Sequence, residues 1–380
     1  MEKNVVIAGY VRTPFHFAGK GDLASVRPDD LAAAAIVELV KRSGIDPAEI
    51  EDLIMGCAFP EGEQGFNVAR LVVNIANLPV SVAGTTVNRF CGSSMQSIHM
   101  AAGAIQMGAG NAFICAGVES MSRIPMGGFN PLLNPALVKN YPQAYIGMGE
   151  TAENLAKKYG IGRDRQDAFA LKSQQKATAA RTAGKLKDEI VVVTTPSGKQ
   201  VTEDGCIRPE TTIEALNGLK PAFDQTGSVT AGTASPLTDG ASATLITSEE
   251  FAKAHGMQIL ARIKSIAVSG CAPEIMGIGP VPATQKALER AKLSVGDIDI
   301  IELNEAFAAQ SLSVIQELKL DENRINLDGG AIAIGHPLGA SGARITGKAA
   351  SLLKREGKKF ALATMCIGGG QGIATILEAV

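Results

Sequence analysis

The sequence predicts an α/β protein built from two similar halves, and two observations indicate this class. Short apolar runs, such as residues 53–55 and 113–116, alternate with helical stretches along the 380 residues, as expected where helices pack on a sheet. A weak internal repeat relates residues 47–56 to residues 295–302. Self-similarity of this kind indicates duplicated structural units.

The first half opens with a strand-like run at residues 5–8, and a helix follows. Apolar residues recur at helical spacing after Asp29 and Asp30. We therefore expect one of these two carboxylates to cap the helix, and Gly44 to end it.

The repeat continues around Cys91 and His336. Each is followed by a helix and then by a strand, which starts at Phe113 in the first half and at Phe360 in the second. The two residues thus occupy equivalent positions in the repeat. A two-fold arrangement of the halves would bring them together.

The segment between the halves has a different character. Residues 125–142 are rich in Pro, Gly and Asn, and a polar, helix-prone stretch covers residues 150–187. We expect this segment to be a lid inserted after the first half. The predicted domains are residues 1–119 with 236–258 as the first half, residues 120–235 as the loop domain, and residues 259–380 as the second half.

The composition excludes several classes of protein. A formal charge of −2, from 36 basic and 38 acidic residues, provides no electrostatic footprint for nucleic acid. No apolar run approaches the ~18 residues of a membrane span, and we expect neither such a span nor a secretory signal. Six cysteines without a C-x-x-C pair are typical of free thiols in a reducing cytoplasm.

Cys91 is a candidate nucleophile because it precedes an amphipathic helix. A cysteine at a helix N-terminus faces unsatisfied N–H groups and the positive end of the helix dipole, and both favour thiolate over thiol. The alternative is a buried structural cysteine in a turn of small residues.

His336 lies in a turn fixed by Gly335 and Pro337, where it could accept the proton of a neighbouring thiol. A satisfied structural histidine is the alternative there.

Cys366 and Asn304 complete the set of candidate residues. Cys366 ends a strand, and the glycines that follow it, Gly368 among them, offer backbone N–H groups for an oxyanion hole. A hairpin turn with an incidental cysteine is the alternative. Asn304 could orient a water or a carbonyl oxygen beside His336.

Two other features carry no function. Residues 342–348 have the spacing of a phosphate-binding loop, but Ala349 replaces the Ser or Thr that magnesium needs. The histidines outside this set, His16, His99 and His255, lack metal-ligand spacing, and we expect no metal site.

Together, four stretches resemble the thiolase family across nearly the whole chain. They are NRFCGSS at residues 88–94, NEAFA at 304–308, GHPLGASGAR at 335–344 and CIGGGQG at 366–372. The resemblance implies the five-layered α-β-α-β-α thiolase fold, from two duplicated βαβαβαββ halves with an inserted loop domain. It also implies an acyltransferase that uses coenzyme A as a substrate, holds no permanently bound cofactor, and forms a homodimer or homotetramer.

The resemblance also implies a role for each candidate. Cys91 is similar to the nucleophile that becomes acylated, and His336 to the group that activates it and later binds an intermediate's oxygen. Cys366 resembles the second acid/base. Asn304 resembles the residue that positions a water, which forms one oxyanion hole with His336. The N–H groups of Cys91 and Gly368 would form the other.

Five further residues resemble the family's positions for coenzyme A and the acyl chain. Ser235 is similar to the serine that contacts pantetheine, and Arg208 to the arginine near the adenine and its phosphate. Met148, Met276 and Phe307 match apolar positions of the pantetheine and acyl channel. A plain loop or core role is the alternative for each of the five.

The degradative type of thiolase fits the sequence better than the biosynthetic type. Gly147 stands where biosynthetic acetoacetyl-CoA thiolases generally carry His, and their longer lysine-bearing loop is missing from residues 125–142. We therefore expect thiolysis of 3-ketoacyl-CoA in fatty-acid β-oxidation, with condensation of two acetyl-CoA as the alternative. A hydratase/dehydrogenase subunit is a possible partner.

Two rival functions were weighed against the residues present. A decarboxylating ketoacyl synthase shares the fold, but it uses a Cys-His-His set. Asn304 stands at the position of the additional His, and Cys366 has no role in that chemistry. A non-catalytic lipid-binding or scaffold protein would have lost catalytic residues, and none is lost here.

Overall fold

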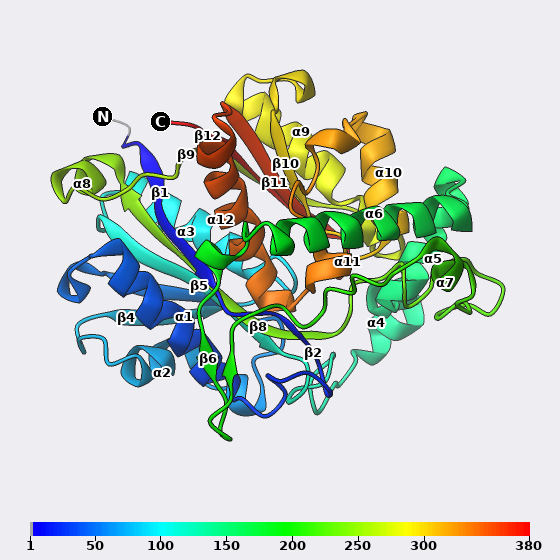
Figure 1. Cartoon of the computed structure of the whole chain (residues 1–380), viewed down its shortest axis with the longest axis horizontal. Helices are drawn as coiled ribbons and strands as arrows, with labels where there is room; N and C mark the ends of the chain where they lie inside the picture. Colours follow the sequence, from blue (N-terminus) through cyan, green and yellow to red (C-terminus); the bar gives the residue numbers. More distant parts are fainter. Residues whose placement is uncertain (1–2) are drawn as a thin grey trace.

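The structure is a computed structural model that describes residues 3–380. Its main sheet has ten strands in the order β10-β11-β12-β9-β1-β8-β5-β3-β4, with β2 paired to β8 (Figure 1). The strands of this sheet are β1 (Val5–Arg12), β2 (His16–Phe17), β3 (Asp52–Gly56), β4 (Ala83–Val87), β5 (Ala112–Ser120), β8 (Thr238–Ser248), β9 (Ala261–Gly270), β10 (Ile300–Leu303), β11 (Phe360–Ile367) and β12 (Gln371–Glu378).

Helices flank and separate the strands, and a two-stranded ribbon of β6 (Val193–Thr194) and β7 (Gln200–Val201) stands apart from the main sheet. The helices are α1 (Pro28–Ser43), α2 (Val68–Ile75), α3 (Ser93–Gln106), α4 (Pro135–Asn140), α5 (Met148–Tyr159), α6 (Arg163–Thr182), α7 (Ile213–Asn217), α8 (Glu249–Ala254), α9 (Pro280–Ala291), α10 (Ala308–Leu318), α11 (Ala331–Ile334) and α12 (Leu338–Glu356).

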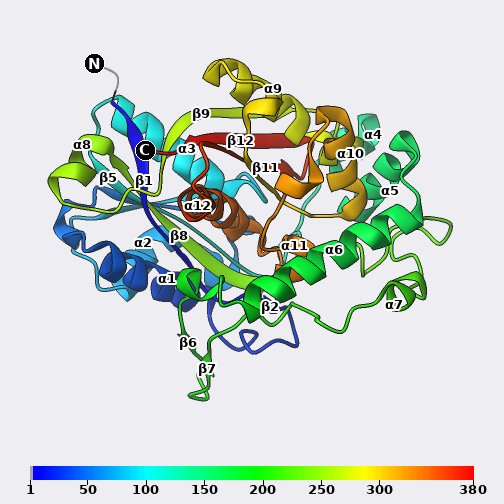
Figure 2. The ribbon, with the colours of Figure 1, turned by 45° about the horizontal axis from the view of Figure 1, so that its top comes forward.

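The sheet has two parts that meet through a short contact. β1 pairs with β9 only at Val6–Arg262 and Ile7–Ala261, whereas β5 pairs with β8 along its whole length. Figure 2 shows α12 nearly end-on, between the part that contains β1 and β8 and the part that contains β11 and β12. The two parts therefore form separate layers.

Three groups of buried apolar side chains hold these layers together. The first, which includes Leu31, lies between the helices α1 and α2 and one sheet part. The central group contains Ile98 of α3 and Ile345 of α12, and the third contains Leu312 of α10. Helices and sheet parts thus alternate as α-β-α-β-α, and the predicted five-layered fold is confirmed.

The internal repeat is also visible in the structure. In the first half a 3-10 turn at Pro47–Glu49 leads into β3, which runs parallel to β5. In the second half a 3-10 turn at Val295–Asp297 leads into β10, which runs parallel to β11. α3 and α12 are therefore equivalent helices, as the repeat predicts.

The first long helix begins earlier than the sequence suggested. α1 starts at Pro28 with Arg27 as the N-cap residue, and no side chain caps it. Proline is well suited to this position because its fixed φ matches the helix and its missing N–H is not needed there. The prediction of a cap by Asp29 or Asp30 is therefore wrong, while Gly44 ends the helix in the left-handed conformation as expected.

The two central helices approach each other closely at their N-terminal ends. Gly342 of α12 packs on the backbone of Met95 in α3, where a Cβ would lie 2.3 Å from the Met95 nitrogen. The Ser94 hydroxyl accepts the N–H of Ala343 at 2.8 Å. This contact places the turns that precede α3 and α12 side by side.

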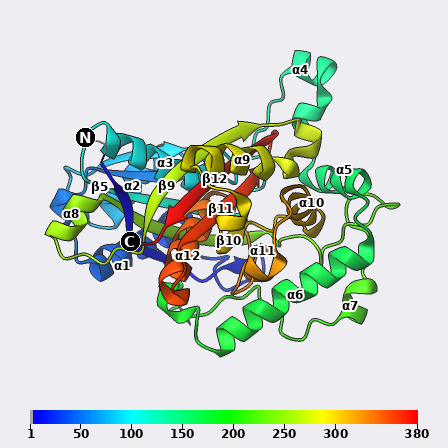
Figure 3. The same cartoon turned by 90° about the horizontal axis from the view of Figure 1, so that it is seen from above.

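The middle segment leaves the first half after β5 and returns with β8. The helix-prone stretch at residues 150–187 forms two helices, because Gly160 adopts φ 64 and ends α5 before α6 begins. α5 and α6 both contact α10 of the second half. Figure 3 shows α4 projecting away from the body of the molecule. In the described part of the chain, no helix is long and apolar enough to cross a membrane.

Candidate active site

Cys91 lies in the tight turn that connects β4 to α3. Phe90, just before it, has φ 43, a left-handed conformation that is uncommon outside glycine. The N–H of Gly92 donates to the carbonyl of Arg89 at 3.0 Å. A Cβ on Gly92 would lie 2.6 Å from Cδ1 of Ile367, so glycine is required for this close approach. The turn therefore seats Cys91 against the end of β11.

The Cys91 thiol is protonated at rest. Burial raises the pKa of Cys91 to about 11, and the nearby backbone N–H of Gly368 offsets only part of this effect. The charge of Glu119 raises the pKa further. The backbone N–H groups around Cys91 lower its pKa and so favour the thiolate, but desolvation outweighs them. A base must remove the proton before Cys91 can attack.

His336 occupies the turn between α11 and α12 and is fixed at several atoms. Its backbone N–H donates to Oγ1 of Thr238 at 3.0 Å. Its Nδ1 lies 2.5 Å from Oγ of Ser341, and that hydroxyl donates its only hydrogen to the carbonyl of Pro337 at 2.9 Å. We therefore assign the ring proton to Nδ1, because Ser341 can then only accept it.

The other ring nitrogen of His336 is ready to accept a proton. Burial lowers the pKa of His336 to about 4, and the charge of Arg344 contributes to the same shift. The imidazole is consequently neutral near pH 7, with the lone pair on Nε2. Nδ2 of Asn304, at the end of β10, lies 3.4 Å from Nε2. The prediction that Asn304 stands beside His336 is confirmed.

Cys366 lies at the end of β11, in the hairpin that leads to β12. Gly369 and Gly370 adopt φ 79 and 83, which permits the sharp turn. Burial raises the pKa of the Cys366 thiol well above its usual range, and the neighbouring Cys91 adds to the shift. A thiol with a high pKa yields a thiolate that is a strong base. The glycine-rich stretch thus brings a second thiol and the N–H of Gly368 next to Cys91.

Most of the predicted channel residues gather in one apolar group. Met148, Met276 and Phe307 pack with Cys366. A Cβ on Gly368 would lie 3.4 Å from the sulfur of Met148, so this methionine borders the loop that contacts Cys91. The group therefore forms an apolar wall beside the two thiols.

Ser235 is attached to this wall, whereas Arg208 lies elsewhere. The N–H of Ser235 donates to the carbonyl of Ala306 at 2.9 Å, next to Phe307. The guanidinium of Arg208 lies over the ring of Phe17. In the described chain no hydrogen bond joins Arg208 to another predicted site residue, so the structure does not bring it into the cluster.

Several residues of the site were not among the candidates. Ser341 and Thr238 fix His336, and Phe223 packs edge-on against Phe307 with ring centroids 5.8 Å apart. Ser341 follows His336 by five residues in a stretch already singled out, so helical geometry could have suggested it. Thr238 and Phe223 come from the middle of the chain, where no sequence signal marked them.

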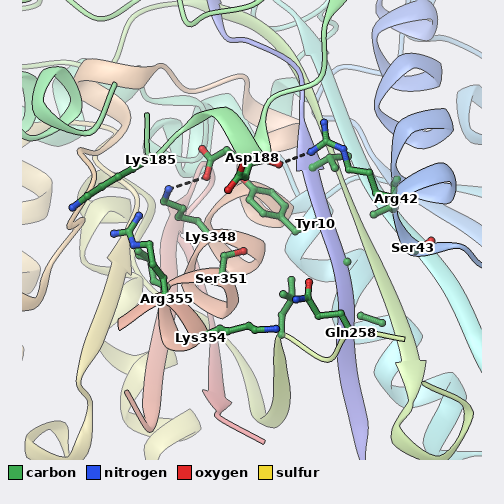
Figure 4. Close-up of a pocket in the computed structure, with 17 residues that line it drawn as sticks. Tyr10, Arg42, Ser43, Lys185, Asp188, Gln258, Lys348, Ser351, Lys354 and Arg355 are labelled. Atoms are coloured by element: carbon green, nitrogen blue, oxygen red, sulfur yellow. Dashed lines mark hydrogen bonds and ion pairs between the residues drawn. The ribbon is translucent and has the colours of Figure 1, made fainter. Parts of the chain in front are cut away.

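A cavity of about 360 Å³ lies away from this cluster, between α1, β1 and the C-terminal part of α12. Figure 4 shows Lys348 and Arg355 along its α12 side. Their charges are already paired, because Lys348 contacts Glu189 at 2.8 Å and Asp328 at 2.7 Å, and Arg355 contacts Asp328. None of the predicted site residues lines this cavity. Within residues 3–380, no group of three or more His, Cys, Asp and Glu could hold a metal ion.

Comparisons with known proteins place this site in a family. The family model for the thiolase N-terminal domain matches residues 5–250, and the model for the thiolase C-terminal domain matches residues 257–379. The chain therefore belongs to the thiolase family, and it is an acyltransferase. The resemblance inferred from the four sequence stretches is confirmed.

Individual relatives indicate which members of the thiolase family this chain resembles. A 3-ketoacyl-CoA thiolase of Bacillus subtilis is 47% identical over 390 residues, covering 100% of both chains. One of Marinobacter nauticus is 50% identical over 388 residues, covering 100% of this chain and 99% of that protein. The crystal structure of human mitochondrial 3-ketoacyl-CoA thiolase matches with a TM-score of 0.91 at 39% identity, over 100% of this chain and 99% of that one. A second structure of that human enzyme is a complex with CoA.

Proposed function

We propose that this protein cleaves 3-ketoacyl-CoA with CoA, giving acetyl-CoA and an acyl-CoA shortened by two carbons, as in fatty-acid β-oxidation. The observation that carries this proposal is the placement of two thiols and a neutral imidazole around one turn. The neighbouring Cys91 raises the pKa of Cys366, and the turns that hold Cys91 and His336 lie side by side. Full-length relatives named as 3-ketoacyl-CoA thiolases support the same reaction.

The first half-reaction begins with proton transfer. Nε2 of His336 takes the proton of the Cys91 thiol, and the sulfur attacks the C3 ketone of the substrate. The bond between C2 and C3 then breaks, which leaves an acyl group on Cys91 and the enolate of acetyl-CoA. The Cys366 thiol donates its proton to C2 of the enolate, and acetyl-CoA departs.

The second half-reaction transfers the acyl group. The Cys366 thiolate removes the proton from the thiol of an incoming CoA, whose sulfur attacks the thioester on Cys91. The Cys91 sulfur leaves and regains a proton from His336, so both residues return to their starting state. Each step is reversible, and Cys366 would take the α proton of acetyl-CoA during condensation.

Two oxyanion sites accompany these steps. The N–H groups of Gly368 and of Cys91 itself lower the pKa of the Cys91 thiol, so both lie near the sulfur, where an acyl-enzyme carbonyl would form. A water held by Asn304, together with the protonated Nε2 of His336, would stabilise the second oxyanion. Each such donor contributes on the order of 3 kcal/mol in comparable enzymes.

Coenzyme A enters this scheme as a substrate, and the proposal includes no permanently bound cofactor. The apolar wall of Met148, Met276 and Phe307 suits the pantetheine arm and the acyl chain. Ser235, held beside that wall, would contact the pantetheine. Arg208 would bind the adenosine phosphate end, which extends far from the reacting thioester.

The proposed assembly is a homodimer, or a homotetramer built from it. β4 is the edge strand of its sheet part, and exposed apolar side chains lie nearby, with Phe66 at 95% and Val80 at 82% exposure. An uncovered edge with apolar neighbours favours pairing with a second copy. A hydratase/dehydrogenase subunit is a further proposed partner. The six free cysteines support a reducing, cytoplasmic location.

The experiment that tests the proposal is CoA-dependent thiolysis of 3-ketoacyl-CoA substrates of increasing chain length. It follows the loss of the magnesium-enolate absorbance and uses Cys91→Ala as the control. Activity on long chains that the variant lacks supports the proposal. Activity confined to acetoacetyl-CoA would make the protein a biosynthetic thiolase. Absence of thiolysis with every substrate would contradict the proposal and favour a scaffold function.

A further inference from the structure

Glu119, near the end of β5, is a buried carboxylate with an unusual set of partners. Its Oε2 accepts the backbone N–H of Ala58 at 2.8 Å and that of Gly339 at 2.9 Å. Its Oε1 accepts Nε2 of Gln64 at 2.8 Å and the backbone N–H of Phe59 at 3.2 Å. Only 1% of the residue is exposed. One side chain therefore joins segments from both halves of the chain.

The negative charge of Glu119 has no cationic partner. Within residues 3–380, no Lys, Arg or His lies in ion-pair contact with it, in contrast to Glu189, which contacts both Arg12 and Lys348. Burial raises the pKa of Glu119, while its hydrogen bonds act in the opposite direction. Burying an uncompensated carboxylate is costly. Such a group is retained where its hydrogen bonds determine a particular geometry.

The segments held by Glu119 are those that adjoin the two reacting side chains. Gly339 lies in the first turn of α12, three residues after His336. Phe59 contacts Phe90, with ring centroids 5.9 Å apart, and Phe90 precedes Cys91. Through these neighbours, Glu119 is linked to the chain segments that carry His336 and Cys91.

The spacing around the carboxylate leaves no room for displacement. A Cβ on Gly339 would lie 2.6 Å from the carbonyl oxygen of Val118 and 2.9 Å from Oε2 of Glu119. A Cβ on Gly117 would lie 2.1 Å from the carbonyl oxygen of Gly339. The end of β5 and the start of α12 are thus in direct backbone contact where Glu119 binds them.

We propose that Glu119 is a positioning residue that sets the distance between the Cys91 thiol and Nε2 of His336, by holding the exit of β3 and the first turn of α12 on one carboxylate. This inference depends on the proposed roles of Cys91 and His336. The charge of Glu119 has a second consequence. Since it opposes ionisation of Cys91, the thiol ionises only when His336 accepts its proton.

The test compares Glu119→Gln with Glu119→Asp. Glutamine keeps the length but removes the charge and turns one acceptor into a donor, whereas aspartate keeps the charge but cannot reach both loops. Both variants are expected to lower kcat/KM for thiolysis by about 100-fold, since misplacement of reacting groups by ~1 Å has effects of this size. The pH midpoint for alkylation of Cys91 by iodoacetamide should move to lower pH in Glu119→Gln alone.

The matched control is Glu189→Gln, which alters a buried carboxylate that contacts Arg12 and Lys348 and none of the candidate catalytic residues. It should lower thermal stability without changing kcat/KM or the alkylation midpoint. Gln64→Met, which removes one donor to Glu119, is the milder variant in case the others fail to fold, and it should lower kcat about tenfold with KM unchanged.

Thiolysis within threefold of the wild type in Glu119→Gln, or an unchanged kcat in Gln64→Met, would overturn the inference. Loss of activity in Glu119→Gln that is matched by the Glu189→Gln control would do the same. Failure of the proposed function looks different, because the wild-type protein would then show no thiolysis, or thiolysis that Cys91→Ala retains.

Discussion

Two buried polar centres adjoin α12, one just before its first residue and one near its middle, and they are built in opposite ways. At the N-terminal end, His336 is surrounded by neutral partners, Asn304 and Ser341. Near the middle of the helix, Lys348 forms ion pairs with Glu189 and Asp328. Both centres are almost completely buried. Comparing the two centres therefore distinguishes the effect of burial on a pKa from the effect of compensating charge.

The comparison shows how one protein uses burial for two purposes. Without a counter-charge, burial keeps the His336 imidazole neutral, with a pKa of about 4, so that it can exchange a proton with Cys91. With counter-charges the outcome reverses. Burial alone would raise the pKa of Glu189, but Lys348 and Arg12 together hold it at about 2. The first centre is suited to chemistry, and the second joins segments of the fold.

His336→Ala is expected to give the largest change. It removes the base that activates Cys91, and it should lower kcat for thiolysis by about 10⁴-fold. The folded protein should remain able to bind CoA, which calorimetric titration would measure. A variant that keeps a tenth of the wild-type kcat would show that another group takes the Cys91 proton.

Lys348→Met should have the opposite profile. It leaves the charges of Glu189 and Asp328 partly uncompensated in a buried place, and it should lower the free energy of unfolding by about 3 kcal/mol. Chemical denaturation would measure this change. The kcat of the folded fraction should stay within twofold of the wild type. A large drop in kcat would mean that the two polar centres are coupled.

The two centres should also make the free energy of unfolding depend on pH in different ranges. The pKa of His336 is lower in the folded state than in the unfolded chain, so the folded state binds fewer protons and becomes less stable as the pH falls. Between pH 6.5 and 4 this effect should amount to about 3 kcal/mol. His99, whose pKa burial lowers to about 3, adds to it. The pKa of Glu189 is lower in the folded state, so its stabilising effect is lost only when the pH falls below the unfolded pKa of about 4.5.

Denaturation of His336→Asn across this pH range provides the check. Its unfolding free energy should depend less steeply on pH between 6.5 and 4 than that of the wild type. Identical slopes would show that His336 is not held neutral by the fold.

Ser341→Ala should cause the smallest change at the first centre. It removes the oxygen that accepts the Nδ1 proton of His336, so the imidazole loses its fixed tautomer and orientation. We expect a fall in kcat of about 10-fold to 100-fold, with KM nearly unchanged. Steady-state thiolysis at several pH values would measure it. Restored activity in Ser341→Thr would confirm that the hydroxyl is responsible.

Much of the fold and the candidate site could be anticipated because the chain repeats itself. The repeat relates Cys91 to His336 directly, and strand–turn–helix units with this relation bring their turns together. Cys366 and Gly368 were recognisable because glycines at the end of a strand leave N–H groups free. Asn304 was named as a neighbour of His336 from its own stretch, residues 304–308, and not from the repeat, and the contact is present in the structure.

The remaining features depend on contacts between distant parts of the chain. The pKa of Cys91 could not be inferred from its place before a helix, because it depends on burial, Gly368 and Glu119, and no local pattern reports burial. The start of α1 was misplaced because Pro28 takes the first helical position without a side-chain cap. Thr238 contacts His336 only because β8 returns to the first sheet part after the inserted segment.

The acyl-enzyme is the most direct test of the whole account. The protein would be incubated with acetyl-CoA, quenched in acid and digested, and the peptides that contain Cys91 and Cys366 would be compared by mass spectrometry. We predict one acetyl group per chain on Cys91, none on Cys366, and its removal when CoA is added before the quench. Acetylation of Cys366 instead, or no acetylated peptide at all, would contradict the assignment of Cys91 as the nucleophile.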